Sequence, residues 1–134
     1  WEDQRVDDPA CLQSVWCRLT EEAGVAWLSM NVRFRSNDAY KAAFMNMFAL
    51  GQLQSRIAAR VAELSGRQIR LGRYCHMADS YHIYGSNMEE FKSRFLGALT
   101  SRSFEGRTMR YADVKEFMEQ ARPAILAKAQ SMGS

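Results

Sequence analysis

The stretch VAWLSMNVRFR, residues 25–35, alternates apolar and polar side chains. Its apolar members fall on the even positions Ala26, Leu28, Met30, Val32 and Phe34. This period of two is typical of a β-strand with one buried face, because successive side chains of a strand point to opposite faces of the sheet. The stretch therefore predicts a strand whose even-numbered residues belong to the core.

The residues before this strand predict its partner. Residues 12–20, which include Val15, Trp16 and Leu19, read as a second strand, and residues 21–24 read as a turn. Strands joined by so short a connection pair antiparallel. We therefore expect a hairpin.

A long helix is predicted after the hairpin. Residues 36–38, Ser-Asn-Asp, are of the types that cap helix N-termini, and apolar residues then recur at steps of three and four from Phe44 to Leu64. Gly66 provides the left-handed residue that commonly ends a helix. We expect a central helix over about residues 39–64.

The remaining sequence predicts more strand and two more helices. Residues 68–84 read as a strand with a bulge or turn near His76, and residues 86–89, SNME, match a capping box that opens a short helix. A last helix is expected from about Tyr111, and Pro123 should kink or restart it.

The composition is that of one folded domain. The chain has 134 residues, of which 47% are hydrophobic and 25% charged, which is enough for one core but not for two. With the predicted elements, this indicates an α+β fold in which a mixed, largely antiparallel sheet packs on a long central helix. We expect a single domain over residues 1–134.

Charge and cysteine content narrow the functional classes. The net charge of +3 comes from Lys and Arg spread along the chain, so it suits an anionic small molecule about as well as nucleic acid and requires neither. Cys11, Cys17 and Cys75 are odd in number without CxxC spacing, which argues against a disulfide framework and a zinc ribbon. No run approaches the roughly 20 apolar residues of a membrane span. We expect a reduced, cytoplasmic protein without a membrane partner.

Two candidate groups lie close to the hairpin. Cys11 precedes the first strand, where it is either a small buried hydrophobe or a nucleophilic thiolate stabilised by Arg33 and Arg35 on the neighbouring strand. Arg35 and Ser36 precede the predicted helix N-terminus, and this arrangement either binds a phosphate or is a solvated helix start. Cys17 and Cys75 are expected to be packing residues.

Three further polar residues lie in or near apolar segments. Asn46 interrupts the run Phe44–Phe48, where its amide either bonds to nearby backbone or binds a ligand. His82 and Tyr84 are two residues apart on a strand, so they share a face and can reach one ligand group, although both could equally have their tips in solvent. His76 beside Cys75 lacks further ligands at usual spacings, so we expect no metal site.

Taken together, three motifs resemble one enzyme family. They are ACLQ at residues 10–13, RSNDAYKAAFMN at residues 35–46 and ADSYHIYGSNM at residues 78–88. In order and spacing they are similar to the folate-dependent thymidylate synthases and the related deoxycytidylate hydroxymethylases, in particular the archaeal-type branch. The resemblance covers about residues 1–91 and implies the thymidylate synthase fold, a methyltransferase activity and a homodimer.

The resemblance implies a role for each matching residue. Cys11 corresponds to the nucleophile that adds to C6 of the pyrimidine. Arg35 and Ser36 correspond to phosphate-binding residues. Asp38 corresponds to the catalytic acid that orients the folate and supports the pyrimidine site. Asn46 corresponds to the amide that reads the pyrimidine edge, and His82 with Tyr84 to the pair that binds the deoxyribose 3′-hydroxyl.

The implied reaction is the reductive methylation of dUMP to dTMP, with 5,10-methylenetetrahydrofolate as co-substrate and no metal. Asn46 favours dUMP, since the hydroxymethylases that act on dCMP have an aspartate at this place; an amide that turns over would nevertheless offer the opposite pattern. A dCMP hydroxymethylase and a non-catalytic nucleotide-binding fragment are the alternatives.

The sequence also departs from the family pattern. Ala-Cys-Leu replaces Pro-Cys-His around Cys11, and Ala78-Asp79-Ser80 replaces Gly-Gly-Asp before His82. The family's glutamate, folate-stacking tryptophan and partner-subunit arginines would precede Trp1. The resemblance therefore implies that this chain is the C-terminal portion of such a protein, and it leaves the activity of the chain alone open.

Overall fold

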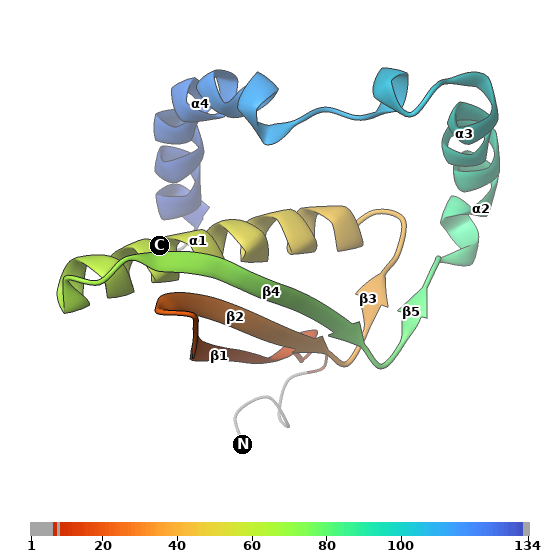
Figure 1. The fold of residues 1–134 in the computed structure, drawn as a ribbon. Helices are drawn as coiled ribbons and strands as arrows, with labels where there is room; N and C mark the ends of the chain where they lie inside the picture. Colours follow the sequence, from red (N-terminus) through yellow and green to blue (C-terminus); the bar gives the residue numbers. More distant parts are fainter. Residues whose placement is uncertain (1–6, 8, 133–134) are drawn as a thin grey trace. The chain divides into compact units, whose positions relative to one another are not determined.

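A computed structural model describes Asp7 and residues 9–132 (Figure 1). The chain divides into two compact units, Trp1–Met88 and Glu89–Ser134. The first unit contains every residue to which the resemblance gives a role. A single domain over residues 1–134 stays a prediction.

The first unit is built on a three-stranded sheet in the order β1-β2-β4. Strands β1 (Leu12–Glu22) and β2 (Val25–Phe34) pair antiparallel, as predicted, and β4 (Ile69–Ala78) pairs with β2 in parallel. Ala23 and Gly24 connect the hairpin with φ angles of 50° and 76°. Two positive φ angles in succession are the mark of the two-residue hairpin turn that matches strand twist.

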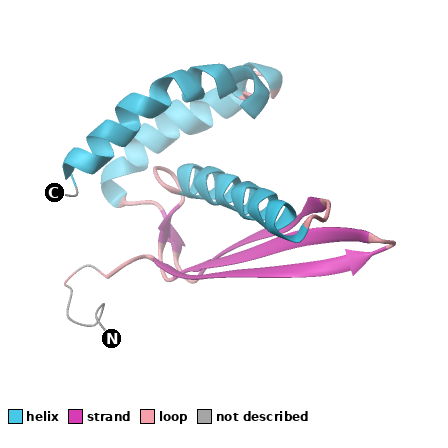
Figure 2. Cartoon of the chain, turned by 90° about the vertical axis from the view of Figure 1, so that its left-hand side faces the viewer, coloured by secondary structure: helices cyan, strands magenta, loops and turns pink. Residues whose placement is uncertain are grey.

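Helix α1 (Ala43–Ser65) packs on one face of this sheet (Figure 2). The even-numbered residues of β2 face it and are buried, and Met30, Val32 and Phe34 form the core cluster with Leu50 of α1 packed against them. The predicted alternation is therefore confirmed. The helix contacts β4 and β2, and β1 is exposed along its whole length.

A bulge in β4 is joined to α1 by one buried amide. The β2–β4 register shifts between Leu28 and Met30, so that Gly72 and Arg73 together face one residue of β2. Gln54, 4% exposed, donates from Nε2 to the Leu28 carbonyl of β2 at 2.8 Å and lies 3.4 Å from the Gly72 and Arg73 carbonyls of the bulge. A Cβ on Gly72 would lie 2.6 Å from Ser29 Oγ, so glycine allows this close approach. A bulge or turn was expected near His76, and the bulge lies before that residue, at Gly72 and Arg73.

The start of α1 differs from the prediction. Asn37 and Asp38 form a short strand, β3 (Asn37–Asp38), which pairs in parallel with β5 (Tyr81–His82). Asp38 Oδ1 accepts the backbone N–H groups of Tyr40 and Lys41 at 2.8 and 3.1 Å. The predicted capping residues therefore cap a turn and pair as a strand, and the regular helix begins only at Ala43. Gly66 ends it with φ 65°, as predicted.

The predicted strand over residues 68–84 is divided in two. It ends as β4 at Ala78, turns at Asp79 and Ser80, and resumes as β5. A 3-10 turn, η2 (Gly85–Asn87), follows. Ser86 lies inside this turn, and Tyr84 is its N-cap without a side-chain bond, so the capping box predicted at residues 86–89 is not formed.

The second unit is helical in its described part. Segments α2 (Met88–Glu90), η3 (Phe91–Leu96, a π-helical stretch) and α3 (Gly97–Ser101) follow one another, and η4 (Glu105–Arg107) leads to α4 (Tyr111–Met132). Phe91 and Phe95 stack at 5.2 Å, as their predicted common face requires. Helix α4 starts where predicted and continues through Pro123 without restarting.

The α+β class with a mixed sheet and a long packed helix is thus confirmed. The antiparallel β1–β2 ladder is the longer of the two in the sheet. Among the described helices, none combines the length and apolar character needed to cross a membrane.

Candidate functional site

The candidate site lies where β2 and β4 end. Because these strands are parallel, their carboxyl ends meet at one edge of the sheet, with Phe34 opposite Ala78. Strands β3 and β5 continue from them side by side (Figure 1). The segment after Phe34 and the segment after Ala78, which carry two of the three motifs, are thereby brought together.

Cys11 and Arg35 are neighbours at this edge. The Arg35 backbone N–H donates to the Cys11 carbonyl at 2.9 Å. The Arg35 guanidinium donates to the Ala10 carbonyl at 3.3 Å and also to the Pro9 carbonyl. The predicted nucleophile is exposed, and the arginine side chain is anchored on the two residues that precede it.

Arg33, which was also expected to support Cys11, is paired with Asp79. Its guanidinium forms a fork with the Asp79 carboxylate, in which Nη2 and Oδ2 are 3.0 Å apart. Both side chains are at least half exposed, so the pair contributes at most about 1 kcal/mol to stability. Arg33 lies on the odd-numbered face of β2, and its position there brings it to Asp79.

Ser36 lies half-buried between β2 and β3. The sequence predicted that the helix N-terminus would follow Arg35 and Ser36 directly and add its N–H groups to a phosphate site. Since α1 begins at Ala43, its first N–H groups do not follow them. The groups that remain from the predicted phosphate site are the Arg35 guanidinium and the Ser36 hydroxyl.

Asp38 and His82 are paired across β3 and β5. Their Cα atoms are register partners, and the Ala39 N–H donates to the His82 carbonyl at 2.7 Å. His82 Nδ1 lies 3.3 Å from the Ser80 hydroxyl, and its ring meets the Tyr84 ring edge-on at 4.8 Å. The predicted neighbours His82 and Tyr84 are thus in contact. Asp38 Oδ2 has no partner in the described part of the chain.

Asn46 lies in the first turn of α1 and bonds to a side chain that the sequence did not single out as a site residue. Its Nδ2 donates to Asn37 Oδ1 at 3.1 Å. Asn37 is 3% exposed, and its Nδ2 lies 2.7 Å from His76 Nε2. His76 Nδ1 lies 2.9 Å from the Tyr74 hydroxyl. Four side chains from β3, β4 and α1 therefore form one chain of hydrogen bonds.

Burial affects both titratable members of this chain. It lowers the pKa of the His76 imidazole, because a low-dielectric environment disfavours the charged ring. Burial, with a smaller contribution from Cys75, raises the pKa of the Tyr74 phenol. The Phe34 ring stacks on His76 at 4.8 Å. A sequence signal existed, since Tyr74 and His76 are two residues apart on one strand and so share a face.

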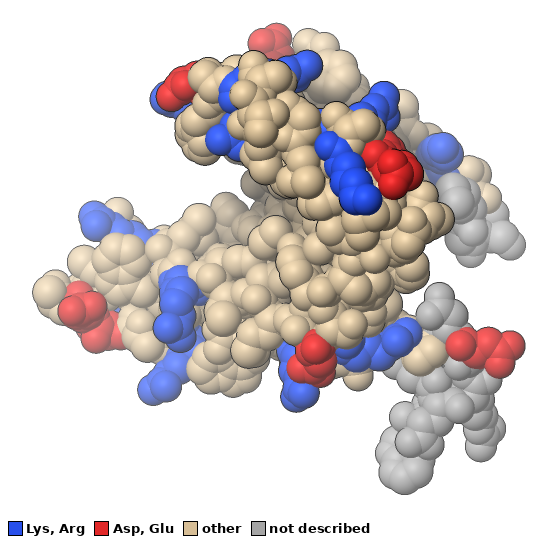
Figure 3. Space-filling model, turned by 90° about the vertical axis from the view of Figure 1, so that its right-hand side faces the viewer, with Lys and Arg blue, Asp and Glu red and all other residues tan. Residues whose placement is uncertain are grey.

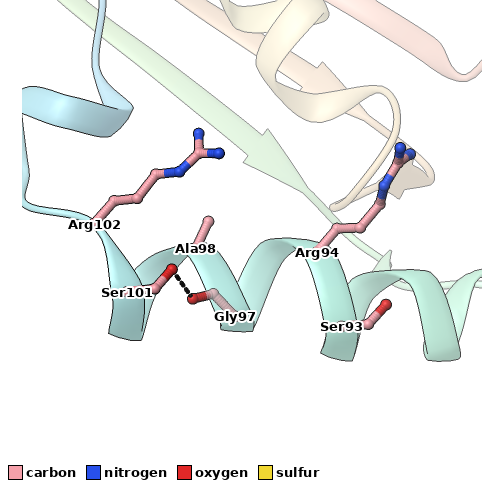
Figure 4. A pocket seen from close by; sticks show the side chains of 6 residues that line it. All are labelled: Ser93, Arg94, Gly97, Ala98, Ser101 and Arg102. Atoms are coloured by element: carbon pink, nitrogen blue, oxygen red, sulfur yellow. Dashed lines mark hydrogen bonds between the residues drawn. The ribbon is translucent and has the colours of Figure 1, made fainter.

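Other surfaces of the molecule carry less specific chemistry. On the face drawn in Figure 3, basic and acidic side chains lie singly or in small mixed groups. The second unit has a groove of about 490 Å³. The side chains of Arg94 and Arg102, which both line it, extend away from the helix (Figure 4). Arg94 also pairs with Glu90 at 3.1 Å. The groove is lined by Ser93, Arg94, Gly97, Ala98, Ser101 and Arg102.

Comparisons of the chain with protein-family models, with curated proteins and with solved structures found no match. Within the described residues, no three His, Cys, Asp or Glu side chains are grouped as a metal site would require. The residues at the carboxyl edge of β2 and β4 are therefore the candidate functional groups.

Proposed function

We propose that the chain belongs to a thymidylate synthase that methylates dUMP to dTMP with 5,10-methylenetetrahydrofolate. One observation carries the proposal. Three separate motifs converge at one edge of the sheet, through the Cys11–Arg35 backbone bond and the Asp38–His82 strand pair. In each motif, the residues that meet are those to which the family resemblance gives a role.

The nucleotide would be bound by groups of three kinds. Arg35 and Ser36 provide a guanidinium fork and a hydroxyl for the 5′-phosphate. His82 and Tyr84, in ring contact, provide polar tips for the 3′-hydroxyl. Asn46 provides an amide whose Oδ1 has no partner within the described residues, and an amide edge matches the adjacent donor and acceptor of a pyrimidine.

The chemistry would begin at Cys11. Its thiolate forms an Sγ–C6 bond, and the electrons of the C5–C6 double bond move onto C5 and O4, where polar donors stabilise the charge. Methylenetetrahydrofolate supplies the one-carbon unit and the hydride that reduces it. After C5 bonds to the one-carbon unit, loss of the C5 proton and cleavage of the bond to the folate nitrogen would leave an exocyclic methylene. Hydride transfer from the tetrahydrofolate to this methylene, with cleavage of the Sγ–C6 bond, would release dTMP, dihydrofolate and the free thiol. In this proposal Asp38 would accept an N–H from the pterin ring with Oδ2, because Oδ1 already accepts from Tyr40 and Lys41.

A second candidate, dCMP hydroxymethylation, differs only in the pyrimidine and in the addition of water in place of hydride. The Asn46–Asn37 contact keeps this candidate open, because it joins two amides and both could turn over together. Incubation of the full chain with methylenetetrahydrofolate and either nucleotide, followed by mass analysis, tests both. Methylated dUMP supports the proposal, and hydroxymethylated dCMP alone would overturn it in favour of the second candidate.

The family resemblance also implies a homodimer. The exposed edge strand β1 supports this part of the proposal, since Val15, Trp16 and Leu19 are 40%, 51% and 43% exposed. A second copy of the chain could cover these apolar side chains. Light scattering that gives the mass of one chain at micromolar concentration would count against it.

A further inference from the structure

The hydrogen bonds behind Asn46 take their direction from the Asn37 amide, which faces His76 with Nδ2 and Asn46 with Oδ1. An amide NH₂ group only donates, so His76 Nε2, which faces Asn37 Nδ2 at 2.7 Å, must accept. The neutral ring then carries its proton on Nδ1 and donates it to the Tyr74 hydroxyl at 2.9 Å. Asn37 consequently turns Oδ1 toward Asn46 and accepts from its Nδ2.

The surroundings of His76 favour this neutral form. The ring is half-buried and stacked on Phe34, while Asn37 is 3% exposed, so an unmatched donor or acceptor in the chain would be costly. Burial also lowers the pKa of His76. The same order of donors and acceptors is therefore kept through all the hydrogen bonds from Tyr74 to Asn46.

If every donor and acceptor in this series were exchanged, the Asn46 amide would present its other end to a ligand. If His76 Nε2 carried a proton, Asn37 would have to accept with Oδ1 and donate to Asn46 with Nδ2. The Asn46 amide would then turn over, and its NH₂ group would replace Oδ1 on the outward side. Uracil and cytosine have opposite donor and acceptor patterns at positions 3 and 4, so each orientation of Asn46 matches only one of them.

We propose that His76 is a positioning residue that acts through Asn37 to fix the orientation of the Asn46 amide, and so sets the preference of the site for dUMP over dCMP. The inference rests on the proposed function, because that function gives Asn46 its base-reading role. It adds three residues, Tyr74, His76 and Asn37, to which the family resemblance assigns nothing.

The test is calorimetric titration of the full chain with dUMP and with dCMP. In His76→Gln an amide replaces the ring and can present either end to Asn37, so we expect the dUMP-to-dCMP affinity ratio to fall roughly fivefold or more, as one misoriented hydrogen-bonding group would cause. The carboxylate introduced by Asn37→Asp accepts from Asn46 whatever residue 76 is. In that background His76→Gln should leave the ratio unchanged.

His82→Gln is the matched control, because it changes the other histidine of the chain. It should weaken both nucleotides to the same degree and leave the ratio as in the wild type. A structural role of His76 would likewise weaken both nucleotides equally. An unchanged ratio in His76→Gln, with both nucleotides still bound, would thus overturn the inference while the proposed function stands.

A nucleotide-free measurement covers the case in which His76→Gln fails to fold. The ¹⁵N spectrum of the wild-type histidines should show a neutral His76 with Nδ1 protonated and Nε2 bare. A proton on Nε2 would overturn the inference. Failure of the wild type to bind either nucleotide would overturn the proposed function and the inference with it.

Discussion

Arg35 makes structural contacts that must be separated from a role in binding. Its guanidinium donates to the carbonyls of Pro9 and Ala10, next to Cys11, so its removal could also loosen this segment. A phosphate contact, unlike a structural one, depends on the charge of the ligand. The comparison of a nucleotide with its nucleoside therefore isolates it.

We predict that Arg35→Ala weakens dUMP binding roughly 10- to 100-fold, as expected for a lost charge-assisted contact, and deoxyuridine binding far less. Arg35→Lys, which keeps the charge but not the fork, should lie in between. Calorimetry with both ligands measures the difference. Equal weakening of both would show that Arg35 acts only by holding the residues before Cys11.

His76 should make stability depend on pH. Because burial lowers its pKa, the unfolded chain takes up a proton first as the pH falls below about 6.5, and the free energy of unfolding then decreases until the folded ring is also protonated. Urea titrations at about pH 7 and pH 5.5 should show a larger loss for the wild type than for His76→Gln. The same loss in both proteins would mean that His76 has no such effect.

For single residues, the sequence predicted their neighbours correctly where the type of a residue alone implies its role. Cys11 and Arg35 are brought together as predicted, and so are His82 and Tyr84. The relay through Asn37 and His76 was not predicted, because it joins strand residues 39 positions apart. A hydrogen bond between distant segments depends on the pairing of β3 with β5, which one sequence does not reveal.

Among the elements, α1 allows a direct test of its capping. Gly66 ends it with φ 65°, a conformation that is unfavourable in free energy for any residue with a Cβ. Gly51 lies within the helix, and a Cβ added there would have no atom within 4 Å. We predict that Gly66→Ala lowers the free energy of unfolding by about 1 kcal/mol.

Gly51→Ala is the matched control and should raise the same free energy by about 0.5–1 kcal/mol, because alanine is the better helix former. Urea denaturation followed by circular dichroism compares the two variants with the wild type. Destabilisation by both would indicate that the packing of α1, and not its backbone conformation, limits these positions.

Element boundaries were predictable where they depend on local signals. The hairpin turn and the Gly66 stop are local and were predicted correctly. The start of α1 was wrong, because residues 37–38 are drawn into a strand by β5, which lies more than 40 positions further along the chain. Tertiary pairing there overrides the capping preference of Asn and Asp.

At the scale of the whole molecule, the α+β class followed from the contrast between a period of two in β2 and a period near 3.6 in α1. The parallel pairing of β2 with β4 joins these elements into a strand, helix and strand unit. That connection brings two chain segments to the same edge of the sheet. The proposed nucleotide site is therefore a consequence of the topology.

In the proposed function, Cys11 is a nucleophile in a site that takes both a pyrimidine nucleotide and a folate. The most direct test is the intact mass of the full chain after incubation with 5-fluoro-dUMP and methylenetetrahydrofolate, with Cys11→Ser treated in parallel. We predict a stable adduct that contains both molecules and is absent in Cys11→Ser. No adduct in the wild type, or an adduct that persists in Cys11→Ser, would contradict the account.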